Sequence, residues 1–252
     1  MLTIAITSGK GGVGKTTFAA NLAAALQETG EQTTVFDADL QLANLDIVLG
    51  IAPTHNLQHV VSGEKTLREI ATTGPGGLTA ITGASAVPML MRAGPKKLGL
   101  FMEQIAQLDA ETDVLVFDTA AGLDQRVMTF MKLAQEVIVV VSPDPTSITD
   151  AYATVKTLFR KDPGARVKVV FNMANPVEAR RLFESFEKIV WSYLKKHVDF
   201  LGSVRHDMEA ARATRKRQLF VVENPTCGAA QDIRAIAQEV RNWKDITMLR
   251  AG

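Results

Sequence analysis

The sequence contains a single cysteine, Cys227, among 252 residues. A disulfide within the chain is therefore excluded, as is any zinc or iron–sulfur site that takes four cysteine ligands from one chain. Long hydrophobic runs are also missing, and Val137–Val141 is far shorter than the roughly 20 residues of a membrane-spanning helix. The N-terminus lacks the charged and apolar regions of a secretion signal. These absences predict a cytoplasmic protein, since a cysteine-poor chain suits a reducing compartment.

An excess of charge of either sign is absent as well. Lys and Arg number 28 against 27 Asp and Glu, which leaves a formal net charge of +1. This balance excludes a wholesale basic surface for nucleic acid, and the only basic cluster is Arg212–Arg217. We expect that cluster to be a solvated helix end, with a small DNA-binding patch as the alternative.

Short apolar runs alternate with longer segments of helical period along the whole chain. The runs predict buried strands at Leu2–Thr7, Thr33–Phe36, Val114–Phe117, Val137–Val141 and Val167–Phe171, with weaker candidates at Leu78–Ile81 and Phe200–Val204. Helices are predicted at Thr16–Glu28, Lys97–Gln107, Gln125–Leu133, Ser147–Phe159, Val177–Lys195 and Ala229–Trp243. This alternation predicts one doubly wound α/β domain over residues 1–252, with a mainly parallel sheet and helices on both faces.

A glycine-rich loop joins the first predicted strand to the first predicted helix. Residues 9–17 read Gly-Lys-Gly-Gly-Val-Gly-Lys-Thr-Thr and contain G-x-x-x-x-G-K-[ST], the phosphate-binding loop. Its glycines let backbone N–H groups turn toward a phosphate, and the helix N-terminus adds its positive dipole end. In this pattern Lys15 contacts the β- and γ-phosphates, and the Thr16 hydroxyl holds Mg²⁺. The predicted nucleotide-binding residues of the loop are Gly11, Gly12, Val13, Gly14, Lys15, Thr16 and Thr17.

Three aspartates stand at the ends of predicted strands. Asp118 follows the run 114–117, and Asp37 and Asp39 follow the run 33–36. Ligands of open α/β sheets bind at the carboxyl ends of the strands, and P-loop NTPases place a carboxylate for Mg²⁺ at such a position. A single aspartate after a strand is often only a turn or capping residue. Three of them beside a phosphate loop favour a nucleotide and Mg²⁺ site.

Lys10 is an additional lysine within the loop. The segment 10–16 resembles the deviant Walker A motif of the MinD/ParA ATPase superfamily. Residues 37–46 are similar to the switch I region of its MinD side, with Gln41 in place of the usual glycine, and residues 118–122 are similar to the Walker B and switch II segment. Segments 74–77, 145–152, 171–174 and 232–237 resemble flagellar-number regulators of the FlhG/FleN branch. The resemblance runs from Leu2 to Trp243.

The resemblance implies an Mg²⁺-dependent ATP hydrolase that forms a homodimer around ATP. Lys10 would reach the ATP of the partner subunit, and Asp39 would polarise the attacking water. Catalysis is thus assigned to Lys10, Lys15 and Asp39, and Mg²⁺ binding to Thr16, Asp39 and Asp118. Asn172 would bond the adenine edge. Asp207 would lie beside the base, although Arg205 and His206 precede it where family members carry a proline-containing loop.

The resemblance also implies the output of the switch. A flagellar transcriptional regulator or assembly protein is the expected partner of the ATP-bound dimer. The alternatives are a ParA-type partition or cargo-positioning ATPase that binds DNA non-specifically, and an ATP-binding regulator whose hydrolysis is incidental. An iron–sulfur relative is disfavoured, because Cys227 supplies two thiolates per dimer. Membrane association, transient or polar, is disfavoured too, because Lys244–Gly252 is too short for a separate targeting helix.

Overall fold

The computed structural model describes residues 1–39, 44–83, 95–122 and 125–251. Within these residues the strands form one sheet in the order β3-β4-β2-β5-β1-β6-β7-β8, and every pairing except that of β3 with β4 is parallel. The strands are β1 Leu2–Thr7, β2 Thr33–Ala38, β3 Thr72–Thr73, β4 Thr79–Ile81, β5 Val114–Thr119, β6 Glu136–Val141, β7 Val167–Asn172 and β8 Asp199–Val204. The predicted mainly parallel sheet is confirmed.

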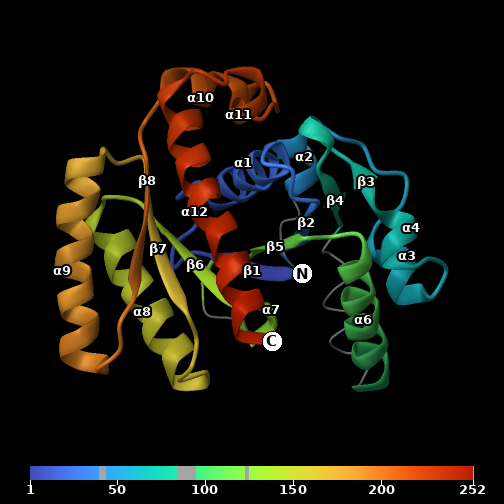
Figure 1. Cartoon of the computed structure of the whole chain (residues 1–252), viewed down its shortest axis with the longest axis horizontal. Helices are drawn as coiled ribbons and strands as arrows, with labels where there is room; N and C mark the ends of the chain where they lie inside the picture. The colour runs from blue at the N-terminus through green and yellow to red at the C-terminus, as the bar shows by residue number, and fades with distance from the viewer. Residues whose placement is uncertain (40–43, 84–94, 123–124, 252) are drawn as a thin grey trace.

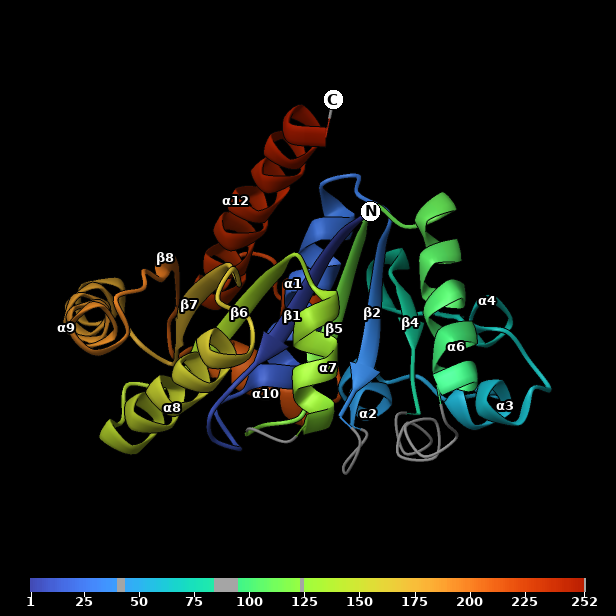
Figure 2. The same ribbon diagram turned by 90° about the horizontal axis from the view of Figure 1, so that it is seen from below.

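Helices cover both faces of this sheet, which is why the central strands are buried along almost their whole length rather than at alternate positions. The helices are α1 Lys15–Glu28, α2 Leu45–Leu49, α3 Leu57–Ser62, α4 Leu67–Ile70, α6 Pro95–Gln107, α7 Gln125–Leu133, α8 Pro145–Lys161, α9 Pro176–Leu194, α10 Met208–Arg215, α11 Phe220–Glu223 and α12 Gly228–Ala251, with 3₁₀ turns η1 Pro75–Gly77 and η3 Leu108–Ala110. Helices α6 to α9 pack on one face, and α1 with α10 to α12 pack on the other (Figures 1 and 2).

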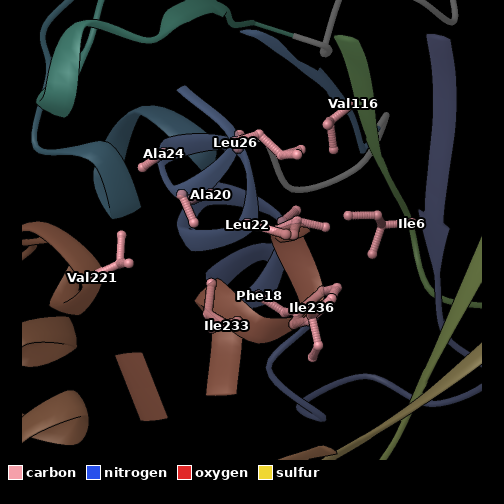
Figure 3. Close-up of a cluster of buried hydrophobic side chains, with 14 of the residues drawn as sticks. Ile6, Phe18, Ala20, Leu22, Ala24, Leu26, Val116, Val221, Ile233 and Ile236 are labelled. Atoms are coloured by element: carbon pink, nitrogen blue, oxygen red, sulfur yellow. The ribbon is translucent and has the colours of Figure 1, made fainter. Parts of the chain in front are cut away.

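The core on the second face is built around α1. Figure 3 shows Phe18 and Leu22 of α1 between Ile6 of β1 and Ile236 of α12. Most other buried positions of α1 are alanines, so α12 and α11 approach its backbone closely. The fully buried Asn21 joins α1 to α11, because its Oδ1 accepts from the N–H of Val221 at 3.0 Å and its Nδ2 donates to the Thr17 carbonyl at 2.8 Å. Both polar ends of this amide are therefore satisfied.

Helix α12 is longer than the sequence predicts. The expected helix ends at Trp243, whereas α12 continues to Ala251 and its C-terminal end projects from the body of the molecule (Figure 2). The apolar stripe formed by Ile233, Ile236 and Val240 is buried against the sheet and α1, so it belongs to the core. Among the described helices, none combines the length and the apolar character needed to cross a membrane.

Candidate functional site

The loop between β1 and α1 has the backbone that a phosphate-binding loop requires. Gly14 precedes α1 with φ at 82°, in the left-handed region, and a Cβ there would collide with the side-chain amide of Asn172. A Cβ on Gly9 would overlap the backbone of Asp150 in α8. No described side chain caps the N-terminus of α1, so the first N–H groups of this helix are available to an anion.

Lys15 and Asp118 form a buried ion pair beneath this loop. The distance between Nζ and Oδ1 is 2.6 Å, and the two side chains are 8% and 1% exposed. Asp118 lies opposite Ile6 in the pairing of β5 with β1, which brings it within reach of the lysine. Burial raises the pKa of Asp118, and the positive charge of Lys15 opposes that shift. The lysine expected to contact phosphate and the aspartate expected to bind metal thus lie side by side.

A hollow of about 360 Å³ opens over the loop. It is lined by Ser8, Gly11, Gly12, Gly14, Lys15, Thr16, Thr17, Asp39, Asn44, Ala120 and Ala121. The structure therefore places Asp39, at the end of β2, at the same hollow as Lys15 and Thr16. The Val13 side chain lies instead in the apolar core, so only the backbone of Val13 is available to a nucleotide. Carboxylate and hydroxyl oxygens are the ligands that Mg²⁺ prefers, so these residues fit that ion.

Asp37 has a structural task at the end of β2. Its fully buried carboxylate accepts from the N–H of Asp39 at 3.0 Å and from that of Leu45 at 3.3 Å. Asp37 thereby holds the residues that flank the segment 40–43. That segment, which includes Gln41 of the expected switch I, lies outside the described residues. Burial, and then the negative charge of Asp118, raises the pKa of Asp37 to about 7.

Lys10 points toward the N-terminus of α8. Its Nζ lies 2.7 Å from the Thr146 hydroxyl and 3.2 Å from Oδ1 of Asp144. Hydrogen bonds from the Ser142 and Thr146 hydroxyls and the Ser147 N–H hold the pKa of Asp144 well below its usual range. The prediction that Lys10 acts across a dimer did not identify these contacts in its own chain. An aspartate directly before a proline that starts a helix is a capping signal, so the sequence could have identified Asp144 as the N-cap of α8 but not as a partner of Lys10.

A second hollow, of about 260 Å³, lies on the other side of the loop. Asn172 at the end of β7 and Asp207 after β8, the two residues expected beside a base, both line it. Asn172 donates from Nδ2 to the Val13 carbonyl at 2.8 Å. Sequence reasoning predicted Gly14 and Thr17 of this lining but missed Phe18, Met173, Ala210, Ala211, Phe220, Ala229 and Ile233, because small and apolar side chains carry no motif.

Asp207 caps two helices at this second hollow. Its Oδ1 accepts from the N–H groups of Glu209 and Ala210 in α10, and its Oδ2 accepts from the N–H of Ala229 in α12. Burial alone would raise the pKa of Asp207, but the backbone hydrogen bonds from Ala210, Ala229 and Glu209 outweigh it and lower the pKa. The departure of Arg205 from the family pattern has a structural reason, since its guanidinium pairs with Asp232.

Comparison with known proteins identifies the family to which this chain belongs. The ParA family profile, described as NUBPL iron-transfer P-loop NTPase, matches residues 2–241. The chain belongs to the ParA/MinD family of P-loop NTPases. Membership of this ParA/MinD family implies ATP hydrolysis.

Relatives of this ParA/MinD protein span most of its length. The antiactivator FleN of Pseudomonas aeruginosa is 38% identical over 95% of this chain and 86% of its own. The flagellum site-determining protein YlxH of Helicobacter pylori is 35% identical over 93% of this chain and 80% of its own. MinD of Pyrococcus horikoshii, solved in complex with Mg-ADP, is 28% identical with a TM-score of 0.77 and 95% coverage of both chains. The recognised branch of the family is thereby confirmed.

Proposed function

We propose that this protein is an Mg²⁺-dependent ATPase that controls flagellar number or placement, and that it switches between an ATP-bound dimer and an ADP-bound monomer. The observation that carries the proposal is the convergence of Lys15, Thr16, Asp39 and Asp118 at the loop after β1. The flagellar assignment is supported by FleN and YlxH, whose similarity extends over nearly the whole chain. The same site geometry would serve other ParA/MinD proteins, so the choice of a flagellar role rests on the similarity to these relatives.

The phosphates would be held by the backbone N–H groups of Gly11 to Thr17 and by the ammonium group of Lys15. Bound Mg²⁺ would neutralise charge on the β- and γ-phosphates, with Thr16, Asp39 and Asp118 as the oxygen donors around it. Asp39 would orient the attacking water from the end of β2. Asn172 would hold the adenine edge, where its amide is already fixed by the Val13 carbonyl. Catalysis would consist of positioning and charge neutralisation.

Lys10 would connect the site to dimer formation. In the single chain its ammonium group is neutralised by Asp144 and held by Thr146. To contact the ATP of a partner subunit it would have to exchange these hydrogen bonds for phosphate oxygens. Because Lys10 is 44% exposed, the exchange requires little change in solvation. Dimerisation would thus be favoured only when a triphosphate offers the stronger charge partner.

The expected output is contact between the ATP-bound dimer and a flagellar transcriptional regulator or assembly protein. DNA binding through Arg212–Arg217 is the alternative, and the structure offers it little support. Arg212 pairs with Glu209 at 2.7 Å. Four cationic side chains neutralise at most about four phosphates, which gives a salt slope near −3.6 and weak binding at physiological salt. Iron transfer is disfavoured because Cys227 is half-buried and burial raises the pKa of its thiol.

Variants of the two loop lysines, compared with each other, test the proposal. Lys15→Ala should abolish ATP–Mg²⁺ binding in titration calorimetry, because it removes the charge closest to Asp118 and the phosphates. Lys10→Ala, the matched control from the same loop, should bind ATP but lose dimerisation and hydrolysis. Circular dichroism confirms that both variants fold. ATP affinity of wild-type strength in Lys15→Ala, or equal loss of all three properties in both variants, contradicts these roles.

The flagellar assignment needs a separate measurement. In a strain that lacks the gene, flagella per cell are counted by electron microscopy after complementation with the wild-type gene or with Lys15→Ala. We expect the wild type alone to restore the normal number and placement. Normal flagella in the deletion strain would refute the flagellar role while leaving the ATPase assignment untouched.

A further inference from the structure

Helices α8 and α9 lie next to each other at one end of the sheet (Figures 1 and 2). Two contacts show which sides of the helices meet. Tyr152 of α8 packs edge to face on Tyr193 of α9, with 6.5 Å between the ring centroids. Further along α8, the centroid of the Phe159 ring lies 5.9 Å from Nζ of Lys196, two residues after α9 ends. The side of α8 that carries Tyr152 and Phe159 therefore faces α9.

Three cations lie along this side of α8. Lys156 is one turn after Tyr152, and Arg160 is one turn after Lys156, so these side chains form a stripe. Lys156 and Arg160 are both exposed, and neither has an ion-pair partner within the described part of the chain. The ammonium group of Lys196 donates to the Pro163 carbonyl at 2.8 Å, an acceptor that carries no full negative charge. The positive charges of all three side chains are therefore available to a partner.

Apolar surface is exposed beside these cations. Tyr193 is 76% exposed, and Ile189, one turn earlier on the same side of α9, is 43% exposed. Tyr152, the other member of the tyrosine pair, is half-buried against the core. Single exposed apolar side chains are common, but here they adjoin one another and cations without counter-charges. We define the α8–α9 patch as Tyr152, Lys156, Arg160, Ile189, Tyr193 and Lys196.

Two of the acidic side chains of α9 lie on its other side, toward β8. Glu184 and Glu187 line a hollow of about 470 Å³ there, together with Arg180, Lys188 and His197. Charges of both signs are mixed in that hollow, and His197 engages Glu187 at 2.9 Å. These carboxylates therefore do not neutralise the patch.

The remaining carboxylates of the two helices are distant from the patch or engaged elsewhere. Glu178 lies in the first turn of α9, about three turns before Ile189. Asp150 is two residues before Tyr152, which places it on the opposite side of α8. Asp162, directly after α8, accepts from a backbone N–H at 3.1 Å and has no ion-pair partner among the described residues. The charges of α8 and α9 are thus segregated, and those of the patch are positive.

The number of cations selects among anionic partners. Three cations neutralise at most about three phosphates, which gives a salt slope near −2.7 and little affinity for nucleic acid at physiological salt. They would increase binding to an anionic membrane by only about a hundredfold, less than the marginal anchoring by one myristoyl chain. Face-to-face contact with a second copy would oppose Lys156 and Arg160 to the same cations. An acidic protein segment fits better, because it can bring apolar side chains to the tyrosines as well as carboxylates to the cations.

We propose that the α8–α9 patch binds a short acidic segment of a partner protein. Carboxylates of the segment pair with Lys156 and Arg160, and its apolar side chains pack on Tyr193. None of the residues of the patch lines either hollow at the phosphate-binding loop, so binding requires no nucleotide. The proposal therefore stands whether or not the flagellar assignment holds.

The test uses the nucleotide-free full chain and a labelled probe peptide, Glu-Glu-Leu-Leu-Glu-Glu-Leu-Leu, which presents carboxylates beside apolar side chains. Fluorescence anisotropy should detect saturable binding that weakens as salt is added, because exposed ion pairs are screened. The same peptide with lysine for glutamate should not bind, and the peptide with serine for leucine should bind more weakly. Failure of the probe to bind would overturn the proposal.

Charge variants matched in number locate the binding surface. Lys156→Gln with Arg160→Gln should weaken peptide binding by about fivefold or more, since two exposed ion pairs are lost. Lys161→Gln with Lys188→Gln removes the same charge from the same helices and should leave the affinity unchanged. Lys161 is nine residues after Tyr152, on the opposite side of α8, and Lys188 lines the hollow toward β8. Equal effects of the two pairs would contradict the assignment of the patch.

The apolar part of the patch has its own matched pair. Tyr193→Ala should weaken peptide binding by about fivefold or more, whereas Val177→Ala, at a 73% exposed residue in the first turn of α9, should not. Cosedimentation with vesicles of phosphatidylcholine and phosphatidylserine distinguishes a lipid surface from a peptide. Vesicle binding that requires Lys156 and Arg160, or a dimer of the free chain that Tyr193→Ala dissociates, would assign the patch to a different occupant and overturn the proposal.

Discussion

At the scale of single residues, the site is governed by carboxylates removed from water. Asp37 and Asp118 lie opposite each other in the pairing of β2 with β5, and both are buried. Asp118 has Lys15 as its counter-charge, whereas Asp37 is held by backbone N–H groups. Burial, and then the negative charge of Asp118, raises the pKa of Asp37 to about 7, and the backbone hydrogen bonds oppose that shift only in part.

Asp37 makes the stability of the protein depend on pH. Its pKa is about 7 in the folded chain against 3.8 as the ordinary value, so folding favours the protonated form. The stabilisation is fully present below pH 3.8 and is lost as pH rises through 7, a change of about 4 kcal/mol at most. In Asp37→Asn this loss should disappear. Urea unfolding of the nucleotide-free chain at pH 4.5 and 7.5 measures it.

The lost acceptor for Leu45 lowers the stability of Asp37→Asn at both pH values, so it cancels in the difference. Glu64→Gln, at an exposed carboxylate, is the control and should keep the pH dependence of the wild type. An Asp37→Asn protein with that same dependence would assign it to another group.

The loop residues and the strand-end aspartates could be predicted because their chemistry depends on local sequence and on the edge of a parallel sheet. The long-range contacts of Asp207 and Asp144 could not be predicted. Asp207 receives the N–H of Ala229, far along the chain, and Asp144 receives Lys10. Both contacts exist only once separate helices have packed, so no local pattern encodes them.

At the scale of elements, the length of a helix or strand determined whether the sequence predicted it. Apart from the C-terminal end of α12, the long helices and the central strands were found within a few residues, because several turns or a full apolar run give a clear period. The short helices α2, α3, α4, α10 and α11 were missed, because one or two turns show no period. Capping boxes were the remaining signal, from Asn56 with His59 for α3 and from Thr66 with Glu69 for α4.

Asp207 should stabilise two elements simultaneously. Asp207→Ala removes the caps of α10 and α12 and should lower the free energy of unfolding by about 2 kcal/mol. Asp207→Asn keeps one carbonyl oxygen for α10 but not the acceptor for Ala229, so an intermediate loss is expected. Chemical denaturation without nucleotide measures both. Equal stability of the two variants and the wild type would leave the capping role without support.

At the scale of the whole molecule, the sheet gathers residues from distant parts of the chain at one edge. The loop after β1, the ends of β2 and β5, and the start of α8 after β6 meet there because these strands run parallel. The proposed dimer would form over this edge, where Lys10 and its partner Asp144 are both exposed.

Substitution of Asp39 should leave dimer formation intact but slow the return to monomer. Asp39→Ala keeps the phosphate contacts of Lys15 but removes the carboxylate that would orient water, so the ATP-bound dimer should persist after the wild type has returned to monomer. Light scattering after addition of ATP and Mg²⁺ follows this decay. Asp46→Ala, at a carboxylate outside the hollow, should behave as the wild type. Unimpaired turnover in Asp39→Ala would reject the role.

The two ends of the sheet differ, and this difference bears on self-association. At one end β4 is covered by β3, which runs antiparallel and has two residues, while at the other end α9 lies beyond the six residues of β8 (Figures 1 and 2). Very short edge strands and edges flanked by a helix resist pairing with another sheet. Both ends of the sheet are therefore protected against edge-to-edge aggregation.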